Sequence, residues 1–531
     1  MSQEQKKQTF LHGTALLAMA TAIVKIIGAL YKIPLNAIIG KQGFSYFNTA
    51  YEIYAVLLMV STAGLPVAMS RMISQSTALR HYNQVRKVYT TARTLFLILG
   101  VTGSLLMTVF CKQLATFLNQ PDAWAAIGAL GPAVLLICIM STYRGFFQGQ
   151  GNMIPTSVSQ VLEALAKLIV GMGLALIVLK MTKSIPFAAA GAIFGVTVSC
   201  LVSALYLFAR FRRSYADLPQ TQEEARPFST TAKGLLFIAI PITLGSAGLQ
   251  ILTMLETKIY MGQLLAQGIP QMQADNMKGV YNMTQTIFNM PCAFITPITI
   301  SIIPAITAHL TQCNDRGAQE TEESAVRIMG LISMHCAIGL AVLAGPVTAL
   351  LGGYRGEDLV LSTRLMSVLG VTVLFNAIVL VTTAIMQAHG NVNRPVINMF
   401  LGGILKLVAV YILTGNPHIG ILGTPVGTLI CYVAISILNI WSIRHLVALP
   451  PRFLKNLVRP LLSALIMGLF VWLSWFGLVH LGVGSRLILC AAPVLVGVVV
   501  YCAAVYKLKV LTREDCLLLP KGEKIARILH L

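Results

Sequence analysis

The sequence predicts an all-α membrane protein that crosses the bilayer fourteen times, as two six-helix lobes and an extra helix pair. Three observations carry this prediction: the composition, a series of long apolar runs and an internal repeat. Of the 531 residues, 56% are hydrophobic and only 11% are charged, whereas a soluble domain has roughly 25% charged residues. A soluble protein needs more charged residues than this to cover its outside, so the composition excludes a soluble protein. The same apolar composition excludes a disordered chain and a disulfide scaffold.

Long apolar runs give the number of spans. A helix needs about 20 apolar residues to cross a bilayer, and the runs lack the strict alternation that a membrane strand requires. Fourteen runs reach this length, at 11–39, 46–69, 89–111, 124–147, 155–179, 185–209, 234–262, 277–309, 326–351, 365–388, 396–414, 419–441, 457–481 and 486–506.

The distribution of basic residues predicts the orientation. The net charge is +21, from 39 Lys and Arg against 18 Asp and Glu. Five of the 39 lie inside spans and eight on the side opposite the termini, which leaves 26 on the terminal side. Cytoplasmic loops of membrane proteins carry the excess of Lys and Arg, so both termini are predicted to be cytoplasmic.

An internal repeat divides the spans. QGQGN at 148–152 matches QAHGN at 387–391, and the same offset of 239 carries Lys167 onto Lys406. GLPVAMSRM at 64–72 resembles SIIPAITAHL at 301–310, and GAIFG at 191–195 resembles GTPVG at 423–427. Six helices return the chain to its starting side, so the two halves are expected to be parallel repeats, which is a transporter architecture. The predicted parts are an N-lobe at 1–209, a cytoplasmic linker at 210–233, a C-lobe at 234–445, an extra pair at 446–506 and a basic cytoplasmic tail at 507–531, expected as a surface helix or a solvated tail.

Charged and polar side chains inside the spans are the candidate site. A charge at mid-bilayer costs about 2.5–3.5 kcal/mol on insertion scales, so each one indicates a function or a partner. Two like charges seven residues apart on one face of the first span suit an anion. The candidates lie in the first two helices of each repeat, and are expected to line one polar cavity: Lys25, Lys32, Glu52, Glu256, Lys258, Gln285 and Asn289.

Other polar residues in the spans have simpler interpretations. Glu163 and Lys167 stand four apart on one helix and are expected to pair with each other. His335 is expected to be a buried histidine with its hydrogen bond satisfied. Pro291, Pro297 and Pro304 predict that the eighth span is bent or broken. For the membrane lysines, the alternative is that they only balance nearby glutamates across a helix contact.

The stretch KQTFLHGTALLAMATAIVKIIGALYKIPLNAIIG, followed by FNTAYEIYAVLLMVSTAGLPVAMSRMIS, resembles the polysaccharide-transport branch of the multidrug/oligosaccharidyl-lipid/polysaccharide (MOP) flippase superfamily. Within that branch the sequence is most similar to Gram-positive lipid II flippases and their sporulation-specific relatives. The resemblance covers the whole chain, and its most specific parts are residues 8–74 and YNMTQTIFNMP at 281–291.

The resemblance implies a function. Members of this family move undecaprenyl-pyrophosphate-linked sugar precursors from the inner to the outer leaflet of the bacterial cell membrane. Basic residues of the first span hold the pyrophosphate-sugar head in a central cationic cavity, which here implies Lys25 and Lys32. The last two helices hold the lipid tail, which here implies 457–506. Gram-negative relatives also place Arg on the second and eighth spans, where this chain has Glu52 and Gln285.

Competing functions stay open at this point. An ion-coupled multidrug exporter of the same superfamily has twelve spans and an acidic cavity, which this sequence does not favour. A membrane enzyme acting on the same lipid needs a large loop with catalytic residues, and a structural sporulation factor leaves the membrane lysines unexplained. The sequence has no Walker A motif, and neither a metal nor another cofactor is expected. The expected partners are the lipid-linked precursor, membrane lipids and either a coupling ion (Na⁺ or H⁺) or the membrane potential, with no nucleic acid.

Overall fold

The computed structural model describes the backbone of residues 3–510 and the side chains of 19–21, 23–296, 299 and 302–510. Its regular elements over these residues are all helices. In chain order they are α1 (Gln3–Met59), the π-helical turn η1 (Val60–Gly64), α2 (Leu65–Ala78), α3 (Tyr82–Val109), α4 (Cys111–Phe117), η2 (Pro121–Ala123), α5 (Trp124–Gly149), α6 (Ile154–Thr182), α7 (Ile185–Ala216), α8 (Phe228–Ala266), α9 (Gln271–Thr311), α10 (Asp315–Val342), α11 (Ala344–Leu351), α12 (Gly356–Ala388), α13 (Asn393–Thr414), η3 (Gly420–Leu422), α14 (Gly423–Leu446), α15 (Phe453–His480) and α16 (Arg486–Lys507).

Twelve stretches of the described residues are long and apolar enough to span a membrane. The all-helical membrane fold is therefore confirmed, whereas the number fourteen is not. One of the twelve, Met19–Ala78, is 60 residues long and covers the first two predicted spans. The eighth predicted span corresponds to α9, which is not among the twelve.

The first two predicted spans join at a single residue. We expected a loop between 39 and 46, but α1 continues through this region and only Gly40 departs from helical geometry, with φ 69° and ψ 174°. An added Cβ at Gly40 would meet no atom within 4 Å. The backbone conformation rather than lack of space therefore requires glycine at this corner.

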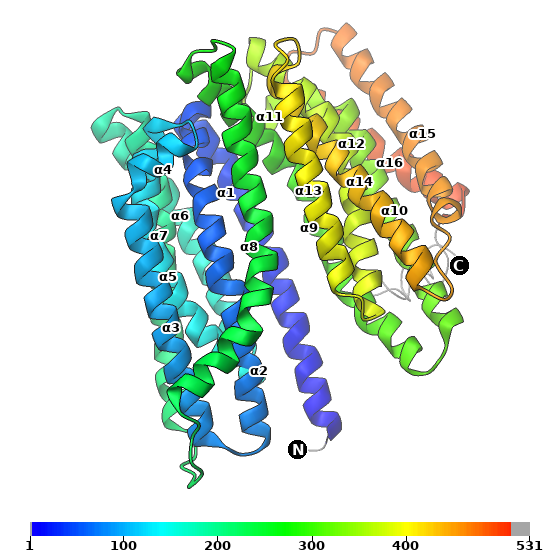
Figure 1. The fold of residues 1–531 in the computed structure, drawn as a ribbon. Coiled ribbons are helices and arrows are strands. Elements are labelled where there is room, and N and C mark those ends of the chain that lie inside the picture. The colour runs from blue at the N-terminus through cyan, green and yellow to red at the C-terminus, as the bar shows by residue number, and fades with distance from the viewer. Residues whose placement is uncertain (1–2, 511–531) are drawn as a thin grey trace. The chain divides into compact units, whose positions relative to one another are not determined.

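Residues fall into two compact units, which we call the N-unit (Met1–Gly279) and the C-unit (Val280–Leu531). In the N-unit, α7 packs on α5 and α6, α3 packs on α5, and α8 packs on α1 and α2 (Figure 1). In the C-unit, α10 packs on α12 and α15, and α14 packs on α12 and α13. The lobe boundaries drawn from the repeat stay a prediction.

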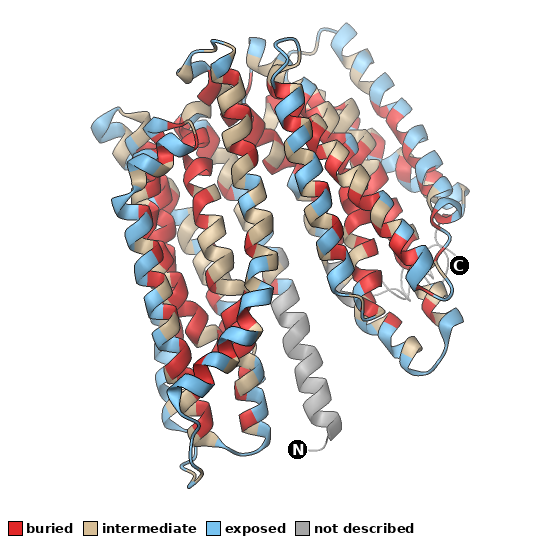
Figure 2. Cartoon of the chain, in the orientation of Figure 1, coloured by how far each residue is buried: buried red, intermediate tan, exposed pale blue. Residues whose placement is uncertain are grey.

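Burial follows the helix faces within each unit. Figure 2 shows stripes of buried residues where helices meet and exposed residues along the other faces. Many large apolar side chains are exposed, among them Phe237 at 83% and Ile169 at 70%. Apolar outer faces suit a lipid surrounding rather than water.

Close helix packing in both units depends on the small residues that the repeat singled out. On α7, a Cβ at Gly191 would lie 3.0 Å from the carbonyl oxygen of Leu174, and one at Gly195 would overlap the backbone of Gly171 on α6. On α14, a Cβ at Gly423 would lie 2.7 Å from the amide nitrogen of Thr414 on α13. The two matching motifs thus mediate the same kind of helix contact.

The QGQGN and QAHGN motifs form the same turn. Gly151 ends α5 with φ 77°, and Gly390 ends α12 with φ 80°. The amide of Asn152 donates to the carbonyl of Phe147 at 2.9 Å, and the amide of Asn391 donates to that of Met386, also at 2.9 Å. These bonds are typical of a glycine-based helix C-cap. The offset of 239 therefore relates backbone geometry as well as sequence letters.

The linker between α7 and α8 (residues 217–227) is attached to the start of α3. The carboxylate of Glu223 accepts hydrogen bonds from the backbone amides of Asn83 (2.5 Å) and Gln84 (3.3 Å). Arg86 donates from α3 to the carbonyl oxygen of Leu218 at 2.7 Å. A carboxylate at a helix N-terminus satisfies amides that have no partner within the helix.

Two further predictions concern α9 and the tail. The span with Pro291, Pro297 and Pro304 is predicted to be bent or broken. α9 is continuous over its 41 residues, so it is not broken, and a bend stays a prediction. The basic tail falls mostly on 511–531, which lie outside the described residues.

Candidate functional site

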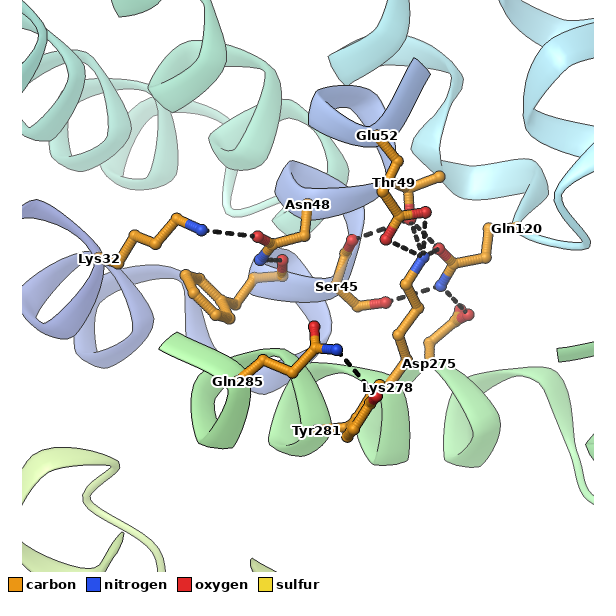
Figure 3. A network of polar contacts seen from close by, with 11 residues as sticks. Lys32, Ser45, Asn48, Thr49, Glu52, Gln120, Asp275, Lys278, Tyr281 and Gln285 are labelled. Carbon is orange, nitrogen blue, oxygen red and sulfur yellow. Dashed lines mark hydrogen bonds and ion pairs between the residues drawn. The ribbon is translucent and has the colours of Figure 1, made fainter. Parts of the chain in front are cut away.

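Lysines of α1 and α6 form a basic face in the N-unit. Lys25 is exposed and Lys32 is half-buried on α1. The Lys32 ammonium donates to the neutral side-chain oxygen of Asn48 at 3.3 Å (Figure 3). On α6, the Lys167 ammonium lies 5.9 Å from the ring centroid of Tyr31 and 5.7 Å from that of Tyr51. We call Lys25, Lys32 and Lys167 the lysine face.

The carboxylates near this face are engaged by other cations. Glu163 pairs with Arg144 of α5, whose guanidinium lies 3.0 Å from the carboxylate. The prediction that Glu163 pairs with Lys167 is therefore wrong, because the partner of Glu163 is Arg144. Glu163 and Lys167 still attract each other electrostatically. Lys32 and Lys167 repel each other. Among the described side chains, no carboxylate lies within ion-pair distance of Lys32 or Lys167, so no ion pair neutralises these two lysines.

A second polar cluster surrounds Lys278, which has no exposed side-chain surface. Its ammonium lies 3.3 Å from the Glu52 carboxylate, and it donates to the Thr49 hydroxyl at 2.7 Å and the Gln120 side-chain oxygen at 3.0 Å (Figure 3). Because a buried ammonium is costly without partners, this arrangement explains how Lys278 is accommodated. The contacts join the start of α9 to α1.

Asp275 extends this cluster one turn before Lys278 on α9. Its two carboxylate oxygens accept hydrogen bonds from the Gln120 amide at 2.7 Å and the Tyr46 hydroxyl at 3.0 Å. The Tyr46 hydroxyl also lies 3.3 Å from the Asp122 carboxylate. We call Tyr46, Thr49, Glu52, Gln120, Asp275 and Lys278 the Lys278 network.

The predicted site residues of the N-unit thus separate into different environments. Lys25 and Lys32 belong to the lysine face, and Glu52 belongs to the Lys278 network. Glu256 is buried on α8 and acts on Lys278 electrostatically. Lys258 lies 3.8 Å from the ring centroid of Phe117, over its face. The structure therefore does not gather these five residues around one point.

The remaining two predicted residues belong to the C-unit. Gln285 donates to the Tyr281 hydroxyl at 2.8 Å and is half-buried, and Asn289 is exposed. The other residues from 280 to 288 are buried. Their spacing of four places Gln285 and Asn289 on one face of α9, as the sequence predicts.

Sequence reasoning missed Lys278 and underrated Lys167. From the sequence, Lys278 counts among the eight basic residues in loops and helix ends opposite the termini, whereas in the structure it lies inside α9, which begins at Gln271. A signal was present, since Asp275 and Lys278 are opposite charges three apart on one helix, and Glu52 needs a cation. Lys167 was underrated because Glu163, four residues away on the same helix, looked like its partner. In the structure Arg144 of α5 pairs with that carboxylate instead.

The C-unit contains an apolar cavity of about 400 Å³. Its walls come from α9, α10, α11, α15 and α16, with Met467, Val471, Val494 and Val498 among the lining residues. His335 also lines it, and its ring Nδ1–H donates to the carbonyl oxygen of Leu331 at 2.7 Å. His335 is thus satisfied as predicted, although it is half-buried rather than buried.

Solved structures share this fold. One is an inward-facing multidrug resistance MATE family transporter of the MOP superfamily, with a TM-score of 0.66 at 18% identity, covering 81% of this chain and 98% of that one. Another is the lipid II flippase MurJ in an inward closed conformation, with a TM-score of 0.65 at 13% identity, covering 92% and 98%. The fold is therefore that of the MOP-superfamily membrane transporters and flippases.

Family and relatives agree with this class. Residues 10–310 match the family described as polysaccharide biosynthesis protein, and the chain belongs to that family. It is 24% identical to the uncharacterized membrane protein YabM of Bacillus subtilis (strain 168), over 99% of this chain and 97% of that protein. From the same organism, stage V sporulation protein B is 24% identical (82% and 83% covered), and lipid II flippase MurJ is 23% identical (75% and 76% covered). The chain is thus an integral protein of the bacterial cell membrane, and the proteins similar to it include a lipid II flippase and a MATE family transporter.

Proposed function

We propose that this protein moves an undecaprenyl-pyrophosphate-linked peptidoglycan precursor, lipid II, from the inner to the outer leaflet. The lysine face carries this proposal. Transfer of a single ion from water to a low-dielectric medium costs on the order of 20 kcal/mol by the idealised Born estimate, so a pyrophosphate needs a charged path across the membrane. Ammonium groups offer it charge-assisted hydrogen bonds.

Two features of the lysine face favour an anionic ligand over a structural role. Lys32 and Lys167 repel each other, and Glu163 is already paired with Arg144. Bringing the two ammonium groups together without an anion is therefore unfavourable. Lys25 lies seven residues from Lys32, about 10 Å along α1. A dianionic pyrophosphate lowers the repulsion between the lysines, and a head group of that length reaches more than one of them.

The other predicted residues have supporting parts in this proposal. Gln285 and Asn289 form a polar, less buried face on α9 that suits the hydroxyl and amide groups of a sugar head. Glu52 sets the position of α1 through Lys278 instead of contacting the anion. Glu256 and Lys258 of α8 remain proposed contributors to the polar path.

The apolar cavity of the C-unit suits the lipid tail. It lies against α15 and α16, the helix pair outside the repeat, and its lining is almost entirely hydrophobic. A polyprenyl chain that occupies such a cavity stays in an apolar environment while the charged head crosses. Because the tail passes from lipid hydrocarbon into the cavity without leaving water, van der Waals packing against the lining, rather than the hydrophobic effect, would hold it there.

Both termini are proposed to face the cytoplasm, from the distribution of Lys and Arg. In that orientation an inside-negative potential drives an anion outward, with about 2.3 kcal/mol per elementary charge per 100 mV.

The test is complementation of a strain depleted of its lipid II flippase, combined with a leaflet-accessibility assay for lipid II at matched protein level. Lys25→Ala and the double variant Lys32→Ala/Lys167→Ala should each abolish outward flux. Lys25→Arg should retain part of it, because Arg keeps the charge and binds phosphate in a bidentate manner.

A matched control is Lys112→Ala, since the Lys112 ammonium also lies over an aromatic ring, 5.5 Å from the centroid of Trp124, but outside the lysine face. It should transport normally. Normal flux in a variant lacking all three lysines of the face would contradict the proposal.

Another lipid-linked polysaccharide precursor, including a sporulation-specific one, is the alternative substrate. This alternative substrate would be supported by a chain that fails to flip lipid II but restores export of a different undecaprenyl-linked sugar. A multidrug exporter is supported only by the likeness of fold to MATE transporters, and it would confer drug resistance that survives removal of the lysine face.

A further inference from the structure

A buried glutamate and a histidine meet in the C-unit. The Glu322 side chain on α10 has no exposed surface, and the His389 side chain at the end of α12 is 13% exposed. Nε2 of His389 lies 2.7 Å from Oε1 of Glu322. The other carboxylate oxygen, Oε2, is buried and has no hydrogen-bond partner among the described residues.

The surroundings of this pair are apolar. Glu322 and His389 are adjacent to a hydrophobic cluster to which α9, α10, α12, α14 and α15 contribute, with Ala318, Ala325, Ile385 and Ala388 among its members. A carboxylate that is both buried and half unbonded is expensive when it is ionised alone. It persists if a proton is shared between the two side chains, as an ion pair with a charged imidazole or as a neutral carboxyl bonded to a neutral imidazole.

Other ionisable groups on the packed helices leave this pair largely to itself. Glu323, the like charge that acts on Glu322, has Arg327 as its own partner at 3.9 Å and accepts from the backbone amide of Arg452 at 3.2 Å. Among the other ionisable groups near this end, Arg316 pairs with Glu320 on the exposed face of α10, and His309 of α9 lies by Asn314. The others are exposed: Arg394 of α13, Arg444 and His445 of α14 and Lys455 of α15.

The position of His389 is fixed by the repeated turn. It is the C-cap residue of α12, with its amide bonded to the carbonyl of Ile385 at 3.1 Å. The C-terminal end of a helix favours a positive charge. At the offset of 239 that relates the two turns, His389 corresponds to Gln150, so the first half of the chain has a neutral amide where the second half has a titratable imidazole.

We propose that Glu322 and His389 form a binding site for one proton, which is occupied while the contact between α10 and α12 is closed. When the contact opens, water hydrates the carboxylate, and above neutral pH both side chains are then free of the proton. Opening therefore releases one proton to the solution, and closing takes one up. The site requires no particular transported substrate, so it goes beyond the proposed function.

Linkage gives the size of the effect. If opening releases one proton, the opening equilibrium increases tenfold for each pH unit. Histidine ordinarily changes charge near pH 6.5, so the tenfold dependence should hold above neutrality. It should fade at lower pH, where the histidine of the open form binds a proton again.

The opening can be followed with the full-length protein in nanodiscs. Ala388→Cys in a Cys-free background places a thiol next to His389, at a residue that is 8% exposed. Its maleimide labelling rate is divided by that of an exposed reference, Gln220→Cys, at each pH, which corrects for thiol ionisation. The ratio should increase about tenfold per pH unit between pH 7 and 8.5.

Three further variants decide the outcome. In the double variant Glu322→Gln/His389→Gln, which has neutral amides at both positions, the ratio should not change with pH. Glu322→Gln alone should also remove the pH dependence. The control Glu323→Gln, next in sequence but paired with Arg327, should keep it.

A pH-independent ratio in the parent protein, or a tenfold dependence that persists in the double variant, would overturn the proposal. Because labelling does not require transport, such a result would leave the flippase proposal untouched. Conversely, a confirmed proton site in a protein that fails to flip lipid II would refute only the proposed function.

Discussion

Replacing Lys278 with methionine should destabilise the N-unit strongly. The ammonium of Lys278 has no exposed surface and contacts Glu52, Thr49 and Gln120. Methionine has a similar length but no charge, so it leaves the Glu52 carboxylate, whose side chain is only 15% exposed, without its cation. Removal of one partner of a buried ion pair costs about 3–5 kcal/mol.

The partner substitution tests the cause. In Lys278→Met/Glu52→Gln both partners of the ion pair are removed, so part of the lost stability should return. The rest should not, because the buried Asp275 and Glu256 also lose the Lys278 cation. The measurement is a double-mutant cycle on unfolding in mixed micelles, with Lys258→Met as control. Because the Lys258 ammonium contacts the Phe117 ring, its loss should cost about 0.5–2 kcal/mol. If the effects at 278 and 52 add to within about 0.5 kcal/mol, the two residues are not coupled and the reasoning fails.

Three further outcomes are expected. Cysteines at the exposed positions 220 and 357 should label from opposite sides of intact cells with an impermeant reagent, and labelling from the same side would refute the predicted orientation. Gly195→Val should destabilise the contact between α6 and α7 by about 1–3 kcal/mol through overpacking, whereas Gly173→Val, with open space around its Cβ, should be tolerated; equal melting temperatures would contradict this. The pKa of Glu223 lies below its usual range because hydrogen bonds from Thr221 and backbone amides outweigh desolvation. Its contact with α3 therefore stabilises at neutral pH and is lost as the pH falls through the lowered value, which hydrogen exchange of the linker at acid pH should detect in the parent protein but not in Glu223→Gln.

The fold was predictable because its causes are local. Apolar runs of span length, glycine pairs at spacing four and the repeated turn after Gly151 and Gly390 are all visible in the sequence. The loop expected before residue 46 was wrong, because a single glycine with positive φ can replace it. The predicted number of spans is affected in the same way. The two helical arms that meet at Gly40 form one continuous apolar stretch, Met19–Ala78, where the sequence predicts two separate spans.

The site was predictable in composition but not in pairing. Lys25 and Lys32 stand out by their depth in an apolar run. Which carboxylate meets which cation depends on helices far apart in the chain, and Arg144 and Lys278 compete successfully for Glu163 and Glu52. Glu322 and His389 were missed for the same reason, because 67 residues separate them and their proximity results from the packing of α10 on α12.

The one-residue corner at Gly40 has a mechanical consequence. It joins the arm that carries Lys25 and Lys32 to the arm that carries Tyr46, Thr49 and Glu52, with no slack between them. If the proposed anion binding rotates the first arm, the second arm must rotate with it, and Glu52 of that arm is held to α9 by Lys278. A flexible loop between the two arms would leave the second arm in place. Gly40 is a single residue between two helices, so it couples their movements.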